Sequence, residues 1–162
     1  MHDTAKSRQN NNAVELHREE DRKARRKMSD CVFCKIIKGE IPCSKVYEDD
    51  RYLAFLDISP INKGHTLVIP KEHYETTLDM PADKLCEMMK IVHKCAAAII
   101  NAVKPDGYNV FINNKKAAGQ EVPHAHFHIA PRFEGDFEFK WPHQKYEDGE
   151  TDEFLKKIQE NL

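Results

Sequence analysis

The sequence has no apolar run long enough to cross a lipid bilayer, and neither sign of charge dominates it. Its 162 residues carry a formal net charge of -2, which gives no overall electrostatic reason to expect a nucleic acid or a membrane surface as partner. The amino terminus lacks the apolar core of a secretory signal and mixes acids with its bases, unlike a mitochondrial presequence. We therefore expect a cytoplasmic protein that binds neither nucleic acid nor membranes.

The cysteine pattern does not resemble the framework of a disulfide-rich secreted domain. There are five cysteines, an odd number, and two of them fall within a helical pattern. Reduced thiols in the cytosol are the simpler interpretation, and Cys86 and Cys95 are expected to pack as small apolar residues.

Composition divides the chain into three parts. Residues 1–28 are polar and are expected to form a disordered tail, because they cannot bury enough apolar surface to offset the entropy of ordering. The basic cluster Arg22–Lys27 follows three acids directly, so it is weak evidence for a nucleic-acid-binding arm. Residues 29–135 carry the pattern of one folded domain, and residues 136–162 form a carboxy-terminal segment that ends in a predicted helix, Thr151–Leu162, with its apolar residues facing inward.

Hydrophobic periodicity predicts the elements of the domain. A short helix begins near Val32 and ends before Gly39, and a long helix follows Pro81 with an apolar stripe from Leu85 to Val103. The predicted strands are Lys45–Glu48, Tyr52–Asp57, His65–Pro70, Tyr108–Ile112 and His124–Ile129. Tight polar connections favour antiparallel pairing, so the prediction is an α+β domain in which the long helix covers an antiparallel sheet.

The most informative stretch is the run His124-Ala125-His126-Phe127-His128-Ile129. Successive side chains of a strand alternate between faces, so the three imidazoles share one face and the apolar residues can pack on the core. Two chemistries fit this pattern. The imidazoles could bind a metal ion such as Zn²⁺, or one of them could attack phosphorus while its neighbours stabilise the phosphoryl oxygens.

Together with three further segments, this run resembles the signature of the histidine-triad family. The segments are Phe55–Pro60, Gly64–Lys71 and Gly119–Val122, and the resemblance covers roughly residues 30–132. It is nearest to the small nucleotide-binding branch, which implies a HIT-like fold, a homodimer and hydrolysis of purine nucleotide phosphoramidates. A dinucleoside polyphosphate hydrolase, a nucleotidyl transferase and a nucleotide-binding interaction protein with incidental turnover remain as alternatives.

The resemblance also implies roles for three histidines. His126 attacks the α-phosphorus to give a nucleotidyl-histidine, which water then hydrolyses. His128 hydrogen-bonds the phosphate, and His65 helps to orient His126 or protonates the leaving group.

By the same resemblance, a larger set of residues contacts the nucleotide. The phosphate oxygens are bound by the polar loop, through Asn113, Gly119 and Gln120. The base is bound by four apolar residues, which are Phe33, Ile36, Phe55 and Ile58. The ribose hydroxyls are bound by the acid Asp57. Glu121 and Val122 complete the nucleotide site. Glu121 stands where many members carry serine or threonine against the leaving group, and an acid there repels a phosphate unless it is protonated or turned away.

The pair Cys31-x-x-Cys34 has the spacing of half a zinc site, although a redox pair has the same spacing. His73 and His124 are the candidate partners. Some members of the resembled family bind zinc with two cysteines and these two histidines, which implies a closed, structural zinc site.

Overall fold

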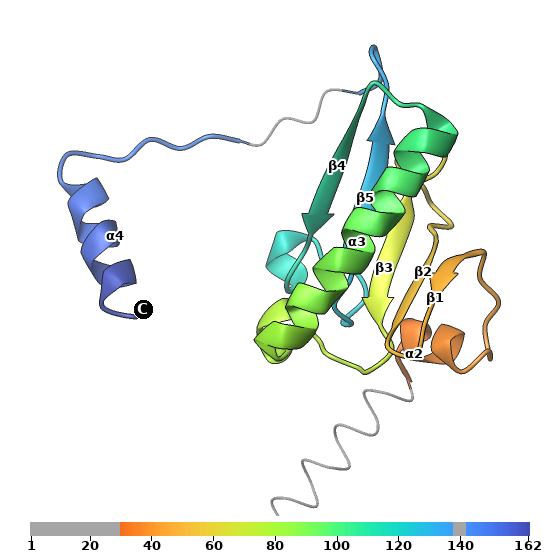
Figure 1. The fold of residues 1–162 in the computed structure, drawn as a ribbon. Coiled ribbons are helices and arrows are strands. Elements are labelled where there is room, and N and C mark those ends of the chain that lie inside the picture. Colours follow the sequence, from red (N-terminus) through yellow and green to blue (C-terminus); the bar gives the residue numbers. More distant parts are fainter. Residues whose placement is uncertain (1–29, 138–141) are drawn as a thin grey trace, which may run out of the picture.

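The computed structural model describes residues 30–137 and 142–162 (Figure 1). The predicted tail, residues 1–28, lies outside the described residues. No helix in the described part of the chain is both long and apolar enough to span a membrane.

One antiparallel sheet of five strands forms the centre of the domain. In spatial order the strands are β1 (Lys45–Glu48), β2 (Tyr52–Leu56), β3 (Thr66–Pro70), β5 (Phe127–Arg132) and β4 (Gly107–Ile112). Every neighbouring pair is antiparallel, and β5, the last strand in the described residues, lies between β3 and β4 (Figure 1). The prediction of an antiparallel sheet is confirmed.

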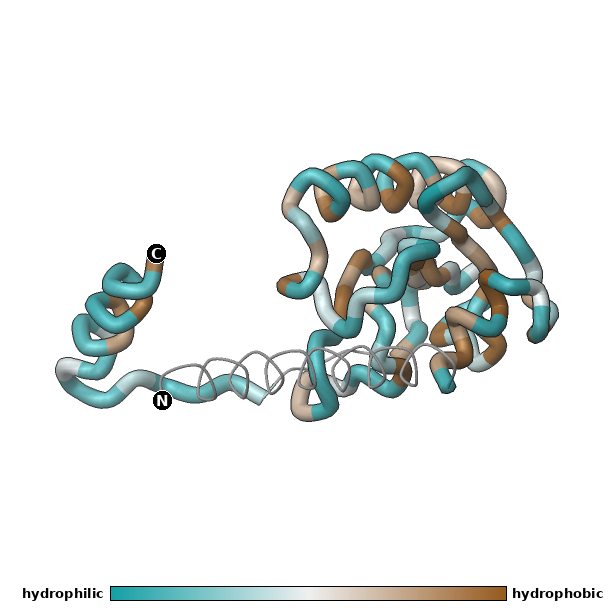
Figure 2. Tube along the Cα trace, turned by 90° about the horizontal axis from the view of Figure 1, so that it is seen from below, coloured by the Kyte–Doolittle hydropathy of each residue, from teal (hydrophilic) through white to brown (hydrophobic). Residues whose placement is uncertain are grey.

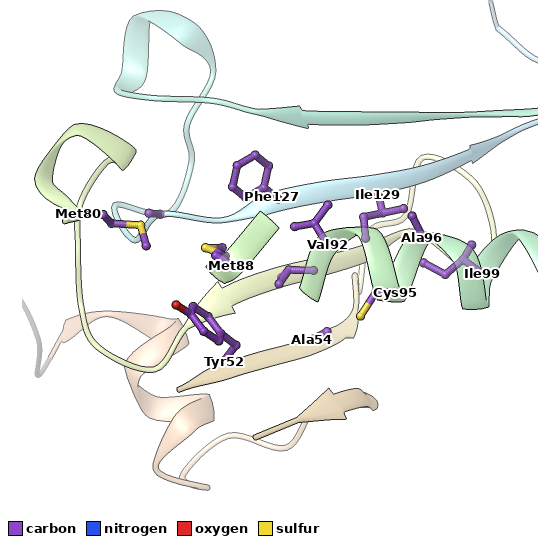
Figure 3. Packing of buried hydrophobic residues seen from close by; sticks show 12 residues of the cluster. Tyr52, Ala54, Met80, Met88, Val92, Cys95, Ala96, Ile99, Phe127 and Ile129 are labelled. Carbon is purple, nitrogen blue, oxygen red and sulfur yellow. The ribbon is translucent and has the colours of Figure 1, made fainter. Parts of the chain in front are cut away.

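Helix α3 (Ala82–Val103) covers one face of this sheet, as the apolar stripe predicted. Its residues Met88, Val92 and Ile99 pack in one buried cluster with strand residues such as Ala54 and Ile129 (Figure 3). Along the helix, apolar positions recur between polar ones (Figure 2), which is the spacing that gives a helix one buried face. The α+β class is therefore confirmed.

The opposite face carries a second core beneath helix α2 (Val32–Ile37). Phe33 and Ile36 of α2 pack there with Leu53, Phe55 and Ile69 of the sheet. Strand β2 is buried on both faces because its alternate residues enter the two cores. Its sequence accordingly reads as a continuous apolar run.

The strand predicted from His124 begins three residues later, at Phe127. The segment before β5 leaves the ladder because the Ala125 N–H donates to the Tyr74 carbonyl instead of to a strand. The alternation of faces nevertheless persists. Ala125, Phe127 and Ile129 all lie in the core under α3, whereas His124 and His126 point to the side of Phe33.

Helix α4 (Glu150–Gln159) forms near the predicted position, but its apolar residues do not face inward. Phe154, Leu155 and Ile158 are 46%, 52% and 61% exposed. Acids in the first turn and lysines in the last turn match the helix dipole, so local interactions favour this helix without a packed face.

Gly64 sits at a tight approach in front of β3. Its φ is +94°, and an added Cβ would lie 3.1 Å from Val103 Cγ2 and 3.3 Å from Pro131 Cγ. We expect Gly64→Ala to lower the free energy of unfolding by about 2 kcal/mol or more, from backbone strain and overpacking. Urea denaturation measures this, with Gly107→Ala as control because its Cβ meets nothing within 4 Å. Equal midpoints for the two variants would contradict the expectation.

Candidate active site

His126 lies at the centre of the candidate site in a fixed tautomer. Its Nδ1 is 2.6 Å from the backbone carbonyl oxygen of His124. A carbonyl only accepts hydrogen bonds, so Nδ1 carries the proton and Nε2 keeps its lone pair. Burial lowers the pKa of His126, so the ring is neutral at neutral pH. The lone pair of Nε2 is therefore ready to act as a nucleophile.

A chain of hydrogen bonds fixes the tautomers of His65 and His128. The Ile61 N–H donates to His65 Nδ1 at 3.2 Å, so His65 Nε2 carries the proton and donates to His128 Nδ1 at 3.0 Å. His128 Nε2 then carries a proton that it can donate. Burial lowers the pKa of both rings, that of His128 to about 4, so this neutral arrangement holds at neutral pH. His65 was expected to help orient His126 or to protonate the leaving group, and its direct hydrogen bond within the triad is to His128.

Phe111 is a site residue that the sequence reasoning missed. Its ring stacks on that of His128, with centroids 4.5 Å apart and an interplanar angle of 4°. The pairing of β4 with β5 sets Phe111 opposite His128. The available signal was the alternation in β4, which sets Asn109 and Phe111 on one side, with the predicted site residue Asn113 directly after the end of the strand.

The imidazoles of His65, His126 and His128 together supply two complementary functions, a nucleophile and a hydrogen-bond donor. The ring centroids of His126 and His128 are 4.8 Å apart, so the ring with a lone pair at Nε2 neighbours the ring with a proton at Nε2. A phosphoryl group between them would meet attack from one ring and stabilisation of its oxygens from the other.

The predicted base-binding residues are only partly gathered in one place. Phe33 and Phe55 meet edge to face with centroids 5.6 Å apart, and Ile36 is buried in the same core. Ile58 is 97% exposed and lies outside that cluster, because it follows the end of β2 in the loop before β3. Asp57, next to it, accepts a hydrogen bond from the Ser59 N–H and lies 3.5 Å from His65 Nδ1.

The polar loop between β4 and β5 is held by Gln120. The Gln120 side-chain amide donates to the Glu75 carbonyl at 2.7 Å and accepts from the Lys115 N–H at 2.7 Å. Both ends are thus engaged, so Gln120 braces the loop with its side chain. Gly119 takes a φ of +85°, and its carbonyl lies 3.4 Å from Asn113 Nδ2.

Two open pockets flank this loop. One, of about 660 Å³, is lined by Phe111, Asn113 and Gly119, and its volume suits a small-molecule ligand. The other is lined by Gly119, Glu121 and two lysines. Glu121 is exposed, and its charge acts on His126. Val122 packs against the core under α2.

Cys31, Cys34, His73 and His124 form a separate cluster, with one donor atom from each within 4.8 Å of the others. His124 Nε2 donates to the Pro70 carbonyl at 2.8 Å, which leaves the lone pair of Nδ1 facing the two sulfurs at 3.5 and 3.7 Å. His73 Nδ1 lies 3.2 Å from His124 Nδ1 and 3.4 Å from the Cys34 sulfur. The edges of a tetrahedron around Zn²⁺ measure about 3.3–3.8 Å for these ligands.

The chemistry of the thiols also fits a cation. Burial and the neighbouring Cys31 sulfur raise the pKa of the Cys34 thiol to about 12. A thiolate therefore forms at neutral pH only beside a positive charge, as a bound metal ion supplies. The four predicted ligands are brought together, and the donor set suits zinc.

The chain is similar in sequence to several known proteins. A curated HIT-like protein of Methanocaldococcus jannaschii is 55% identical over 129 residues, covering 79% of this chain and 98% of that protein. An adenosine 5′-monophosphoramidase of Schizosaccharomyces pombe is 46% identical over 63% of this chain and 74% of its own length. An adenylylsulfatase of Arabidopsis thaliana is 48% identical over 67% of this chain, which spans about half (55%) of that enzyme.

The fold of the chain is also similar to the folds of solved structures. A crystal structure from Streptococcus mutans matches with a TM-score of 0.76 and 45% identity, over 82% of this chain and 85% of that one. A zinc-bound histidine triad family protein from Mycobacterium smegmatis matches with a TM-score of 0.64 and 35% identity, over 83% of this chain and 99% of that one. The expected HIT-like fold is confirmed. The HIT domain model matches residues 38–135, and with these relatives it establishes that the chain belongs to the HIT domain family.

Proposed function

We propose that this protein hydrolyses purine nucleotide conjugates at the α-phosphate, with nucleoside phosphoramidates as the preferred class. The observation that carries the proposal is that two rings with complementary tautomers are neighbours: His126, with a lone pair at Nε2, has its ring centroid 4.8 Å from that of His128, which carries a proton at Nε2. A relative named as an adenosine 5′-monophosphoramidase supports the phosphoramidate class, and a relative named as an adenylylsulfatase supports the broader class of nucleotide conjugates.

The reaction proceeds in two displacements at one phosphorus atom. His126 Nε2 attacks the α-phosphorus, a P–N bond to the histidine forms, and the bond to the leaving group breaks as that group takes up a proton from solvent. Water then attacks the same phosphorus and gives one proton back to solvent, the P–Nε2 bond breaks, and the nucleoside monophosphate is released. His128 Nε2–H stabilises the phosphoryl oxygens in both steps.

The remaining site residues bind and orient the nucleotide. Phe33, Ile36 and Phe55 offer an apolar wall for the base, and the exposed Ile58 can close over it. Asp57 accepts the Ser59 N–H at Oδ1, and its Oδ2, 3.5 Å from His65 Nδ1, is the oxygen that we assign to the ribose hydroxyls. The backbone around Gly119, with Asn113 and Val122 beside it, surrounds the phosphate, while Gln120 holds that loop in place.

We further propose that Cys31, Cys34, His73 and His124 bind a structural Zn²⁺. Four protein ligands leave no position for substrate, so the ion contributes to the fold and does not take part in the reaction. The zinc-bound relative from Mycobacterium smegmatis supports this assignment.

A rapid quench with an adenosine phosphoramidate labelled at phosphorus, followed by intact mass measurement, tests the function. We expect a labelled protein heavier by one AMP unit, and no such species in His126→Ala. Equal turnover by wild type and His126→Ala, without an adduct in either, would overturn the proposal in favour of a nucleotide-binding protein.

Glu121 is expected to influence the choice of leaving group. Its exposed carboxylate lines the pocket beside the loop and repels phosphate-rich leaving groups. We expect Glu121→Ser to raise kcat/KM for diadenosine polyphosphates relative to adenosine phosphoramidates by about threefold to tenfold, because removing one nearby charge changes such interactions by about 1 kcal/mol. Competition between the two substrates measures the ratio, and an unchanged ranking would exclude this role.

We expect activity to fall in acid only at pH values below the ordinary pKa of an imidazole. Burial lowers the pKa values of His65, His126 and His128 from 6.5, so the neutral forms persist as pH falls to that value. At still lower pH, protonation of His126 Nε2 removes the attacking lone pair. We expect the acid limb of kcat/KM to be centred below pH 6.5, measured where circular dichroism shows an intact fold. A limb centred above that value would contradict the assignment.

We also propose that the protein is a cytoplasmic homodimer. All five cysteines are free thiols, which suits a reducing compartment. Strand β4 lies at the edge of the sheet with Tyr108 and Val110 50% and 38% exposed, and a second subunit would cover them. A monomeric mass in solution at micromolar concentration would exclude the dimer.

A further inference from the structure

The candidate metal cluster and the candidate nucleophile are joined by helix α2. Cys31 caps this helix, and Cys34 lies within it. Between them, the Phe33 ring contacts His124 and His126 edge to face, with centroid distances of 5.8 and 5.2 Å. A movement of α2 therefore displaces the apolar wall beside the nucleophile.

His124 also connects the candidate metal cluster to His126, through its ring and its backbone carbonyl. Its ring faces both thiols through Nδ1, and its Nε2–H donates to the Pro70 carbonyl. Its own carbonyl accepts the Nδ1–H of His126 at 2.6 Å. Whatever fixes the His124 ring thus fixes the acceptor that selects the tautomer and orientation of His126.

Helix α2 depends on its tertiary contacts to hold this position, because its intrinsic helix stability is small. It has six residues, and isolated helices shorter than about 12 residues are marginal in water. Its N-cap makes no side-chain hydrogen bond. Four metal–ligand bonds would tie the two cysteines of this helix to His73 and His124.

Building on the function proposed above, we infer that Cys31, Cys34 and His73 are positioning residues, through which a bound metal ion sets the nucleotide affinity of the site. Metal and nucleotide are then coupled ligands. By linkage, the factor by which the metal strengthens nucleotide binding equals the factor by which the nucleotide strengthens metal binding.

Calorimetric titration of the full-length protein with AMP, zinc-loaded and chelator-treated, tests this coupling. AMP presents a base, a ribose and a phosphate but no bond to be cleaved. We expect AMP affinity to fall at least tenfold on zinc removal. Equal affinity in the two forms would overturn the coupling alone. No AMP binding by the zinc-loaded protein would overturn the proposed function, and the coupling with it.

A second measurement separates positioning from simple unfolding of the zinc-free chain. Zinc affinity is measured by chelator competition at rising AMP concentration. Coupling between two folded states predicts a gain that levels off at the factor found by calorimetry. A gain that rises without limit, with loss of the circular dichroism signal on zinc removal, would mean that zinc only folds the chain and would overturn the inference.

The tautomer of His126 gives a readout that a purely structural role would not move. In nitrogen-15 NMR we expect the zinc-loaded protein to show His126 protonated at Nδ1 alone, and the folded zinc-free protein to show both tautomers. Cys43→Ser is the matched control, because Cys43 packs beside the same core but contributes no ligand. An unchanged tautomer in the folded zinc-free protein would contradict the positioning role.

Discussion

Replacing His126 with alanine is expected to lower kcat by about four orders of magnitude or more, because the variant has no atom that can form the covalent intermediate. AMP affinity should stay within a few-fold of wild type, since the base wall and the loop around Gly119 are unchanged. Steady-state kinetics and AMP titration measure the two quantities separately. A large loss in kcat with little change in affinity identifies a group that acts in the chemical step.

His93→Ala is the matched control for this variant. His93 is an exposed histidine on α3, away from the site, so its removal should leave kcat unchanged. A His126→Ala enzyme that retains more than about a tenth of wild-type kcat would assign the attack to water or to another residue, because loss of a nucleophile costs far more than that.

Loss of a cysteine from the candidate metal site is expected to be the largest stability effect among single substitutions. We expect Cys34→Ser to purify without stoichiometric zinc and to lose about 3–5 kcal/mol of unfolding free energy, since metal binding contributes directly to the stability of a closed site. For a domain of this size that corresponds to a drop in Tm of about 10 °C or more. Metal analysis and thermal unfolding check the two parts.

Cys86→Ser is the control. Cys86 was expected to pack as a small apolar residue, but it is an exposed free thiol on α3, so its replacement should change stability by less than about 0.5 kcal/mol. The metal site would be rejected if purified wild-type protein contained no zinc and Cys31→Ser left the Tm unchanged.

Patterns within single elements predicted most of the fold. The stripe on α3 and the alternation from Ala125 to Ile129 follow from local geometry, and both sets lie in the predicted core. The start of β5 was wrong because the Ala125 N–H bonds to Tyr74, 51 residues earlier, and no local pattern carries that information. The inward face expected for α4 was wrong because an amphipathic helix reads the same whether or not a partner covers it.

Less of the candidate site could be predicted from patterns within single elements. The resemblance supplied the histidines, but Phe111 acquires its place only when β4 and β5 pair and bring it against His128. In the same way, Gln120 matched a phosphate-binding position, and only the fold reveals that Glu75 and Lys115 engage both ends of its amide. Contacts between distant segments decide both cases.

The placement of β5 between β3 and β4 also fixes an order of assembly. As the chain emerges from the ribosome, β1, β2 and β3 can pair in sequence as neighbours, whereas β4 pairs only with β5 in the finished sheet. Strand β4 therefore has no sheet partner until residues 127–132 have been made. The pairing of β5 with β3, which joins residues 66–68 to residues 127–129, is long-range in sequence, and such pairings are slow to form. His126 and His128 enter their surroundings in the same event that closes the sheet. A nascent chain that stops short of β5 thus has no reactive centre, so catalytic competence arrives together with the completed domain.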